Sequence, residues 1–497
     1  MPKSFEDWEK LAADIEIDPR PFIGAGRIAT DGSDAFSTIN PYDGSVVATY
    51  TDCDEDVVGK AVEHAKATFE SGTWSRNTMA ERAAVLNQWA DKVAENADVL
   101  ALLDSLEMGM PIANAAGDVE YSADFIRETA SLGLSLTSPA GVTAPGTLNL
   151  NMIEPLGVIA AITPWNFPVN QVLVRIVPAL VMGNSVVLKP SEVATASALR
   201  LADLALEAGL PAGVLNVVTG TGAQTGAALV RDPRVARIAF TGSTGTGARI
   251  QALAAEAGVP KPMTMELGGK SPHIVCASFD EVADLAPVIA QSIFWNSGQV
   301  CSAGSLLIVH ENLADELVQA VMELGKGFTP GHPLDPNTQF GPIATRGQYK
   351  QVQAHLSNAK DEGANVHPAY QTTDGLFVAP TLVDGIAPNA AIAREEIFGP
   401  VLAVARYTEL SEAIELANSS GFGLVATAWT KDLGEGHRLA RALKAGSVTI
   451  NSSIGVGGEI STSLGLEPVG NSGFGADYGF PGLMQFAHAK MIAFNTH

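Results

Sequence analysis

From residue 157 onward, short apolar runs rich in β-branched residues alternate with longer segments whose apolar residues recur at helical spacing. This alternation predicts an α/β architecture, in which helices cover both faces of a parallel sheet. The expected strands are 158–162, 185–188, 214–218 and 237–240, and the expected helices are 169–182, 195–208, 222–230 and 246–257. Ligands of such sheets bind beyond the carboxyl ends of the strands, so the residues just after each run are candidates for chemistry.

A second alternating region follows and predicts a second α/β domain. Its expected strands are 273–275, 306–309, 400–404 and 447–450, and its expected helices are 281–296 and 311–326. Residues 1–150 are expected to be mostly helical after a short opening strand region, with helical spacing at 54–70 and 79–108. The Gly- and Pro-rich stretch 325–340 is expected to be an exposed excursion.

Composition and charge narrow the function classes. The 497 residues are 46% hydrophobic and 17% charged, which is typical of a compact protein and excludes disorder. A net charge of −24 disfavours nucleic acid and anionic membranes as partners. The cysteines lie far apart without CxxC spacing, which argues against disulfides and a structural metal site. Since the first residues lack a signal-peptide pattern, we expect a cytoplasmic protein with neither a metal nor a membrane span.

Cys301 lies in the polar run Asn-Ser-Gly-Gln-Val-Cys-Ser, between a predicted helix and a predicted strand. A free cysteine is most often a small buried hydrophobic residue. A catalytic thiolate instead needs partial exposure and nearby hydrogen-bond donors. The surroundings of Cys301 offer both, whereas those of Cys53 and Cys276 do not. Cys301 is therefore the candidate nucleophile.

Glu266 and Asn166 also follow predicted strands. Glu266 comes after the expected strand 262–265 and precedes a Gly-Gly turn. It is either a solvated carboxylate or a general base that faces the cleft. Asn166 lies in a turn fixed by Pro164 and Pro168. Its amide either satisfies the turn backbone or points at an oxyanion.

Three further turns are candidates for binding a nucleotide. Lys189 and Glu192 form either a plain strand-to-helix turn or a pair that binds ribose hydroxyls, where the carboxylate would favour NAD over NADP. The Gly-rich turns at 240–245 and 220–222 precede helices, whose backbone N–H groups suit a diphosphate. Neither turn has the GxGxxG spacing, so each is weak evidence alone.

Taken together and in this order, the motifs resemble those of the aldehyde dehydrogenase superfamily of the non-acylating type. The resemblance runs from about residue 40 to the C-terminus and rests on Thr-Pro-Trp-Asn-Phe-Pro at 163–168, Lys-Pro-Ser-Glu at 189–192, Phe-Thr-Gly-Ser-Thr at 240–244, Glu-Leu-Gly-Gly-Lys at 266–270, Gly-Gln-Val-Cys at 298–301 and Glu-Glu-Ile-Phe-Gly-Pro at 395–400.

The resemblance implies a role for each matching residue. Cys301 would be the nucleophile and Glu266 the base, and Asn166 would form an oxyanion hole with the backbone N–H of Cys301. The implied NAD-binding residues, with NADP as a possible cofactor, are Thr163, Pro164, Trp165, Lys189, Glu192, Gly222, Thr241, Gly242, Ser243, Leu267, Glu396 and Phe398. Within this set, Lys189 and Glu192 would bind the adenosine ribose, Ser243 the diphosphate, and Glu396 and Phe398 the nicotinamide riboside.

The resemblance also implies an architecture and a reaction. It predicts a Rossmann-like cofactor domain (1–140 and 157–265), a catalytic domain (266–450), and a small β-arm with a C-terminal segment (141–156 and 451–497) in a homodimer or homotetramer. The expected reaction is NAD-dependent oxidation of an aldehyde to a carboxylic acid through a thiohemiacetal and a thioester on Cys301. Two alternatives stay open: a coenzyme A-acylating semialdehyde dehydrogenase, which Glu266 argues against, and a thiol esterase without redox chemistry.

Several positions depart from the family pattern. Arg175 replaces the usual Lys and keeps the charge but cannot carry a proton. Leu306, Gly470 and Ala476 replace other basic residues, and the loop 455–479 diverges, which leaves the substrate open. The pocket candidates by family position are Phe167, Asn170, Val174, Trp295, Val300 and Ser302, a mix that suggests a medium aliphatic or aromatic aldehyde.

Overall fold

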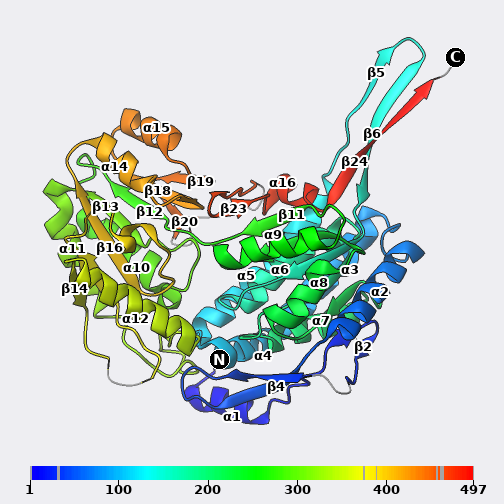
Figure 1. Ribbon diagram of the computed structural model, residues 1–497, viewed down its shortest axis with the longest axis horizontal. Coiled ribbons are helices and arrows are strands. Elements are labelled where there is room, and N and C mark those ends of the chain that lie inside the picture. The colour runs from blue at the N-terminus through cyan, green and yellow to red at the C-terminus, as the bar shows by residue number, and fades with distance from the viewer. Residues whose placement is uncertain are drawn as a thin grey trace.

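Two lobes lie side by side, and an arm of strands projects from one of them (Figure 1). The computed structural model describes residues 3–30, 34–372, 375–387, 389–454, 457–458 and 464–495, with the backbone alone at 454 and 457–458. Each lobe has its own sheet covered by helices. The part of the divergent loop at 455–456 and 459–463 lies outside the described residues.

The first lobe contains an eight-stranded sheet in the order β2-β1-β9-β8-β7-β10-β11-β23. Strands β7 to β11 are mutually parallel along this order. The bounds are β1 (Phe22–Ile23), β2 (Gly26–Arg27), β7 (Val158–Ile162), β8 (Ser185–Lys189), β9 (Leu215–Val217), β10 (Val235–Thr241), β11 (Met263–Glu266) and β23 (Gly473–Phe474). The strand order reverses between β7 and β10, and such a reversal opens a crevice for ligands at the carboxyl edge.

The helices of this lobe lie in two layers because successive side chains of a strand point to opposite faces. Ile159 and Ala161 of β7 pack with the layer of α3 to α7, whereas Val158 and Ala160 pack with α2, α8 and α9. The bounds are α2 (Glu55–Ser71), α3 (Met79–Glu95), α4 (Ala97–Met108), α5 (Ile112–Leu134), α6 (Pro168–Val181), α7 (Ala196–Glu207), α8 (Ala227–Arg231) and α9 (Thr244–Glu256). With both faces covered, β7 and β8 are buried along their whole length and therefore read as unbroken apolar runs.

The second lobe has a seven-stranded sheet in the order β14-β15-β16-β13-β12-β18-β19, parallel except for β14. Its strands are β12 (Pro272–Val275), β13 (Leu306–His310), β14 (Asn365–Pro368), β15 (Thr381–Asp384), β16 (Val401–Tyr407), β18 (Val425–Trp429) and β19 (Ser447–Ile450). Its helices are α10 (Val282–Phe294), α11 (Glu311–Gly325), α12 (Arg346–Asp361), α13 (Ala391–Arg394), α14 (Leu410–Ala417) and α15 (Leu433–Ala442).

The arm is a three-stranded sheet in the order β24-β6-β5, from β5 (Ala140–Ala144), β6 (Thr147–Pro155) and β24 (Ala487–Asn495). The small remaining elements are α1 (Phe5–Asp14), β3 (Asp34–Ile39), β4 (Val46–Asp52), β17 (Phe422–Gly423), β20 (Ser453–Ile454), β21 (Gly457–Gly458), β22 (Val469–Gly470) and α16 (Gly479–Met484). Among the helices in the described ranges, none is both long and apolar enough to cross a bilayer.

The α/β class and every strand predicted in the two alternating regions are confirmed, with ends shifted by a few residues. The domain limits stay a prediction, although β11 and β12 belong to different sheets. The prediction that 1–150 is mostly helical after a short strand region was incomplete, because helix α1 precedes strands β1 to β4. The segment 79–108 has continuous helical spacing but forms two helices, α3 and α4. The break lies at Asn96, whose side chain donates to the carbonyl of Lys92 and ends α3.

Two other predictions were wrong in detail. Residues 222–230 begin with a π-helical turn (Gly222–Gly226) before α8. The stretch 325–340 is not simply exposed, because Leu334 and Phe340 are buried and the ring of Phe340 packs against Phe328 at 6.4 Å.

Candidate active site

The carboxyl edge of the first sheet brings together four of the predicted site residues. In the strand register, Lys189 is opposite Ile162, so Thr163 lies one step beyond the end of β7 beside it. Thr241 and Glu266 are opposite each other at the ends of β10 and β11. The residues that sequence analysis placed after separate strands therefore share one edge, at the point where the strand order reverses.

Glycines pack the Glu266 turn against the two other motifs of the site. A Cβ at Gly269 would overlap the carbonyl oxygen of Cys301, and one at Gly268 would overlap the carboxylate of Glu396. Glu396 Oε1 also accepts a hydrogen bond from the backbone N–H of Gly269 at 3.0 Å. The turn after β11 thus contacts both the Cys301 loop and the Glu396 segment, and this contact leaves no space for larger residues.

The loop that carries Cys301 has an uncommon backbone. Asn296 and Ser297 have φ values of 48° and 53°, and Gly298 has a φ of 70°. A Cβ at Gly298 would overlap the backbone of Gly399, so only glycine fits there. Left-handed non-glycine residues cost free energy and persist where the surrounding packing holds them. The packing around this loop therefore fixes the position of Cys301.

Asn166 connects the turn after β7 to the same loop. Its Nδ2 donates to the carbonyl of Gln299 at 3.0 Å, and its own carbonyl accepts from Asn296 Nδ2 at 3.1 Å. The Gln299 side chain is held in turn, because its Oε1 accepts from the N–H of Ala344 at 2.8 Å. The side-chain amide of Asn166 is thus held rigidly against Gln299, which lies two residues before Cys301 in the sequence.

Burial dominates the electrostatics of the site. Burial, together with the nearby carboxylates of Glu396 and Glu266, raises the pKa of the partly exposed Cys301 thiol to about 12. Burial also raises the pKa of Glu266 to about 8, although the charge of Arg175 acts in the opposite direction. At neutral pH the thiol is therefore protonated, and Glu266 is mostly protonated too, so that its base form becomes the major one only above about pH 8.

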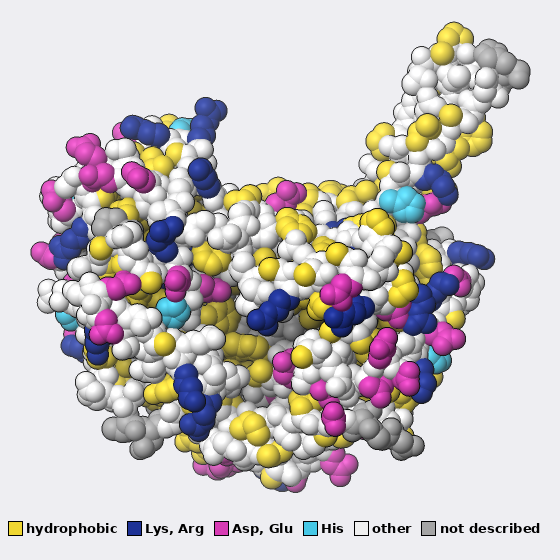
Figure 2. Space-filling model, in the orientation of Figure 1, with side chains coloured by type: hydrophobic (Ala, Val, Ile, Leu, Met, Phe, Trp, Pro, Cys, Tyr) yellow, Lys and Arg dark blue, Asp and Glu magenta, His cyan; other side chains and the backbone are white. Residues whose placement is uncertain are grey.

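The Lys189–Glu192 turn keeps its charges paired. Lys189 Nζ lies 2.9 Å from Glu192 Oε2, and the lysine side chain is almost fully buried. Burial acts to raise the pKa of Glu192, but the charge and hydrogen bond of Lys189 lower it overall. A cavity of about 520 Å³ adjoins Glu192 and extends to the 37–44 segment and to Arg346. Figure 2 shows the hollow between the lobes, with hydrophobic side chains on its floor.

Hydroxyl groups and helix starts lie along the same edge. The hydroxyls of Thr163 and Thr241 are buried and have no hydrogen-bond partner among residues in the described ranges. Ser243 is the N-cap of α9 and accepts from the N–H of Thr246. Leu267 packs against Gly247 in the first turn of α9.

Other predicted binding residues lie on either side of this edge. Gly242 follows Thr241, and a Cβ there would overlap the ring of Phe240. The rings of Trp165, which follows Pro164, and Phe398 meet edge to face at 5.5 Å.

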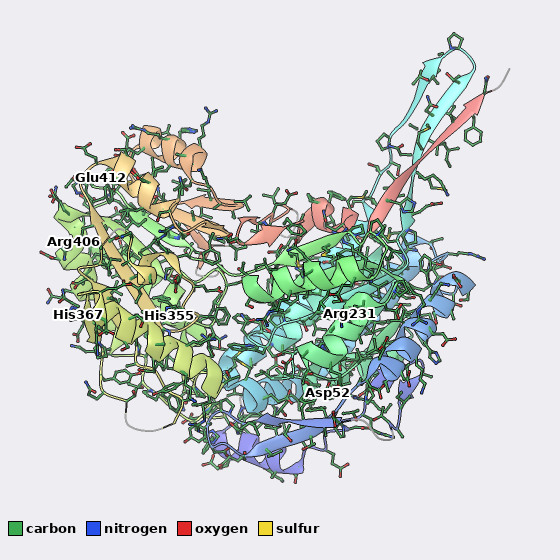
Figure 3. The ribbon with its side chains drawn as sticks, in the orientation of Figure 1. Asp52, Arg231, His355, His367, Arg406 and Glu412 are labelled. Atoms are coloured by element: carbon green, nitrogen blue, oxygen red, sulfur yellow. The ribbon has the colours of Figure 1, made fainter. Side chains whose placement is uncertain are left out.

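The turn that begins at Gly222 is fixed from β4. Asp52, labelled in Figure 3, accepts from the N–H of Thr221 at 2.9 Å and from Thr225 Oγ1 at 3.0 Å. The same hydroxyl also lies 2.6 Å from the carbonyl oxygen of Cys53, which shares its single proton with Asp52. These bonds hold the π-helical turn and place its N-terminus near Glu192, whose carboxylate accepts from the N–H of Gly222.

Sequence analysis missed two acidic residues near the site. Asp118 on α5 accepts from the backbone N–H of Asn170, and burial raises the pKa of Asp118 to about 7. Asp477 forms a buried ion pair with Arg175. Asp118 is one turn from Ser122, which accepts from Asn170 Nδ2 at 3.4 Å. The one sequence signal that could have identified Asp118 is its spacing of one helical turn from the small polar residue Ser122.

Comparisons with known proteins find similarity along nearly the whole chain. A model of the aldehyde dehydrogenase family matches residues 28–492. The chain is 38% identical over 486 residues to the NADP/NAD-dependent aldehyde dehydrogenase PuuC of Escherichia coli K12, covering 98% of this chain and 97% of PuuC. It is 37% identical to the aminoacetaldehyde dehydrogenase of Pseudomonas aeruginosa, covering 95% and 94% of the two chains. The solved indole-3-acetaldehyde dehydrogenase AldA of P. syringae, in complex with NAD+ and IAA, superposes with a TM-score of 0.96 at 37% identity over 99% of this chain and 100% of that chain.

Proposed function

The chain belongs to the aldehyde dehydrogenase family and oxidises an aldehyde to a carboxylic acid with NAD(P), and within this activity we propose that Cys301 is the nucleophile and Glu266 the base. The observation that carries the assignment is the convergence of three motifs. The Cys301 loop packs on the Glu266 turn through Gly269, and Asn166 binds the same loop through Gln299.

Cys301 Sγ adds to the carbonyl carbon of the aldehyde and holds it as a thiohemiacetal and, after oxidation, as a thioester. Asn166 and the backbone N–H of Cys301 donate to the oxygen that becomes negative, and one such donor typically contributes about 3–4 kcal/mol to the rate. Because the thiol has a raised pKa, it needs a proton acceptor; Glu396 and Glu266 are the nearby carboxylates, and we assign this role to Glu266. Glu266 must release the thiol proton to solvent before hydrolysis, and its carboxylate then deprotonates the water that attacks the thioester.

The residues at the sheet edge fit a nicotinamide dinucleotide, which when bound supplies the hydride acceptor. The hydroxyls of Thr163 and Thr241, which have no partner within the described ranges, and the N-terminus of α9 at Ser243 can donate to a polar ligand. Lys189 and Glu192 are a donor and an acceptor for ribose hydroxyls. A carboxylate at Glu192 repels a 2′-phosphate, so NAD is the preferred cofactor of the two.

The experiment is a Glu266→Gln variant followed by pre-steady-state NADH formation and by mass spectrometry of quenched enzyme. If Glu266 mainly serves deacylation, the first burst persists while steady turnover falls by about 10²-fold or more, and acyl-Cys301 accumulates. Equal losses in both phases would assign Glu266 to Cys301 activation instead. Wild-type rates in both phases would overturn the role of Glu266. Adding coenzyme A tests the acylating alternative, since formation of an acyl thioester in solution would support it.

We further propose that the substrate carries a positive charge. Asp118 is half-buried, but its Oδ2 is buried and lacks a hydrogen-bond partner among the described residues, and Asn170 joins Asp118 to the first turn of α6 beside Asn166. A buried carboxylate without a partner favours a cation. The aminoacetaldehyde dehydrogenase of Pseudomonas aeruginosa, to which this chain is similar, is named for an amino-bearing aldehyde, which supports this class.

An Asp118→Asn variant tests the substrate class with a trimethylammonium aldehyde, whose charge does not change with pH. KM for this aldehyde should rise about tenfold or more, while KM for a neutral aromatic aldehyde stays within about twofold. In the wild type, KM for the charged aldehyde should fall as the pH rises through about 7, because Asp118 becomes ionised. Glu120→Gln, on the exposed side of α5, is the matched control. A higher KM for both aldehydes would contradict the proposal.

We also propose that the arm joins copies of this chain into a homodimer or homotetramer in the reducing cytosol, where Cys301 stays a thiol. The arm exposes several apolar side chains, among them Val142 at 73% and Met491 at 67% (Figure 2). Such a surface is typical of an interface. Met491→Asp should lower the mass measured by light scattering to that of one chain, and an unchanged mass would exclude β24 from the interface.

A further inference from the structure

The end of β4 is fastened to the loop that follows β9 in the first sheet. The N–H of Cys53 donates to the carbonyl of Thr219 at 3.0 Å, and Thr219 Oγ1 donates to the carbonyl of Thr51 at 2.7 Å. β4 itself pairs only with β3 in the described part of the chain, in a separate two-stranded sheet. Asp52 lies between these two contacts and is 7% exposed (Figure 3). A buried carboxylate therefore reaches the first lobe from outside its sheet.

Both oxygens of the Asp52 carboxylate have partners at the start of the π-helical turn Gly222–Gly226. Oδ1 accepts from the N–H of Thr221 at 2.9 Å and lies 3.0 Å from Thr225 Oγ1, and Oδ2 accepts from Thr221 Oγ1 at 3.0 Å. Because the Thr221 hydroxyl gives its only proton to Asp52, its lone pairs accept the N–H of Gln224 at 3.3 Å. Asp52 thus orients Thr221 as the N-cap of the turn.

The backbone of this turn differs from that of a regular α-helix. The N–H of Gly226 donates to the carbonyl of Thr221, five residues earlier, at 3.1 Å. Turns with this wider spacing are rare and are often found at functional sites. A Cβ at Gly220 would overlap both Thr225 Oγ1 and Asp52 Oδ1, so the loop is packed tightly against the carboxylate. Asp52 is therefore part of what holds the turn in its unusual shape.

The same turn also contacts the two residues proposed for the adenosine ribose. The carboxylate of Glu192 accepts from the N–H of Gly222, and a Cβ at Gly226 would lie 4.0 Å from Lys189 Cδ. Lys189 Nζ and Glu192 Oε2 are 2.9 Å apart. Since Gly222 and Gly226 each follow directly after a threonine that faces Asp52, one short turn joins Asp52 to the Lys189–Glu192 pair.

Resting on the proposed cofactor site, we propose that Asp52 is a positioning residue for the adenosine half of NAD. By fixing Thr221 and Thr225, it keeps the N–H of Gly222 on Glu192, so that the carboxylate and the ammonium of Lys189 stay in place for ribose hydroxyls. Without Asp52, the turn relaxes and its first N–H groups move away from Glu192. Asp52 acts through the turn, so its loss weakens cofactor binding and leaves the chemical step unchanged.

The experiment measures, on the whole enzyme, the Kd of NAD, AMP and nicotinamide mononucleotide by calorimetry, and kcat at saturating NAD. Asp52→Ala should raise the Kd of NAD and of AMP by about tenfold, because the turn loses its cap. The Kd of nicotinamide mononucleotide and kcat should stay within about twofold of the wild type. Asp52→Asn keeps one acceptor oxygen, so it should raise the Kd of AMP by less.

Asp54→Ala is the matched control, because Asp54 lies two residues further along and caps α2 by accepting from the N–H of Val57 at 2.9 Å. It should lower the unfolding temperature but leave the Kd of AMP unchanged. An unchanged Kd of AMP in Asp52→Ala would overturn the inference. An equal rise in Asp54→Ala, or an equal loss of affinity for nicotinamide mononucleotide, would also overturn it.

Two further variants keep the inference open to refutation if Asp52→Ala does not fold. Asp52→Asn, and Thr225→Val, which removes the hydroxyl beside the carboxylate, should each raise the Kd of AMP, and unchanged values in both would overturn the inference. The wild type separates the two proposals. If it fails to bind NAD and AMP, the proposed cofactor site is wrong, whereas normal wild-type binding with unchanged binding in the Asp52 variants overturns the inference alone.

Discussion

The carboxyl edges of the two sheets both bury polar and titratable side chains, but they treat them differently. At the first edge, Glu266 Oε1 and the hydroxyls of Thr163 and Thr241 lack partners among the residues with described placement. In the second sheet, Trp429 Nε1 donates to His273 at 3.3 Å, and Tyr407 donates to the carbonyl of Val275 at 3.1 Å. A buried polar atom without a partner costs free energy, so the unpaired edge is the one built for a ligand.

Cys276 and Cys301, which lie near these two edges, show which property distinguishes a catalytic thiol. Cys276 directly follows β12 at the carboxyl edge of the second sheet. Burial raises the pKa of Cys276 to about 11. The pKa of Cys301 is also raised by burial. A raised pKa therefore does not separate a catalytic thiol from a structural one. Partial exposure of the sulfur and a base beside it distinguish the catalytic thiol from the structural one.

The largest expected effect contrasts these two thiols. Cys301→Ala should reduce NADH production from an aldehyde panel by at least about 10³-fold, since no other group replaces the nucleophile. Cys276→Ala should keep kcat within about twofold and lower the free energy of unfolding by about 1 kcal/mol. Substantial activity in Cys301→Ala would remove the distinction between the two edges.

An intermediate effect concerns stability in acid. Burial lowers the pKa of His273 to about 4, below its usual value of 6.5, so the folded state holds this side chain neutral. The stability due to this group is complete above pH 6.5 and is lost as the pH falls toward 4, by about 1.4 kcal/mol per unit at most. In urea unfolding, a His273→Gln variant should be least stable relative to the wild type at pH 7, and the gap should shrink at pH 5. A gap that widens in acid would contradict the assignment.

The smallest effect compares two threonines. Thr241→Val removes a hydroxyl that has no partner among the described residues, so stability should stay equal or rise, while KM for NAD rises a few-fold. Thr427→Val breaks the 3.0 Å bond to Thr449 and should cost about 1 kcal/mol of unfolding free energy without changing KM for NAD. Calorimetry measures the unfolding stability of both variants, and steady-state kinetics measure their KM for NAD. Equal losses of stability in the two variants would contradict the predicted difference between the two edges.

The alternating strands were predictable because a buried parallel strand leaves an unbroken apolar run, as at β7 and β8. Cys301, Glu266 and Asn166 were identifiable as candidates because local turns mark their positions. Helix α5 was not predicted, since it begins after Pro111 without a side-chain cap and contains small and polar residues. The π-helical turn at 222–226 was missed for a different reason, because it depends on Asp52 from a distant strand.

The pairs that refine the site were beyond sequence reasoning. Arg175 was noticed as a substitution, but its partner Asp477 is reached only through the pairing of β23 with β11. Asp118 becomes relevant only when α5 packs beside the first turn of α6. Such contacts depend on tertiary packing and leave no periodic pattern.

The arm strand β6 also constrains how the protein is made. Its partner β24 comes from the end of the described chain, and the bonded side chains of Glu154 and Lys490 are 336 positions apart. At translation rates of roughly 5–20 residues per second, β6 waits tens of seconds for that partner. Meanwhile one edge of β6, with its apolar Leu148 and Met152, is open to neighbouring nascent chains. The three-stranded sheet of the arm is therefore completed only after the residues between Glu154 and Lys490 have been made, and chaperones that shield strand edges should matter for the yield of this enzyme.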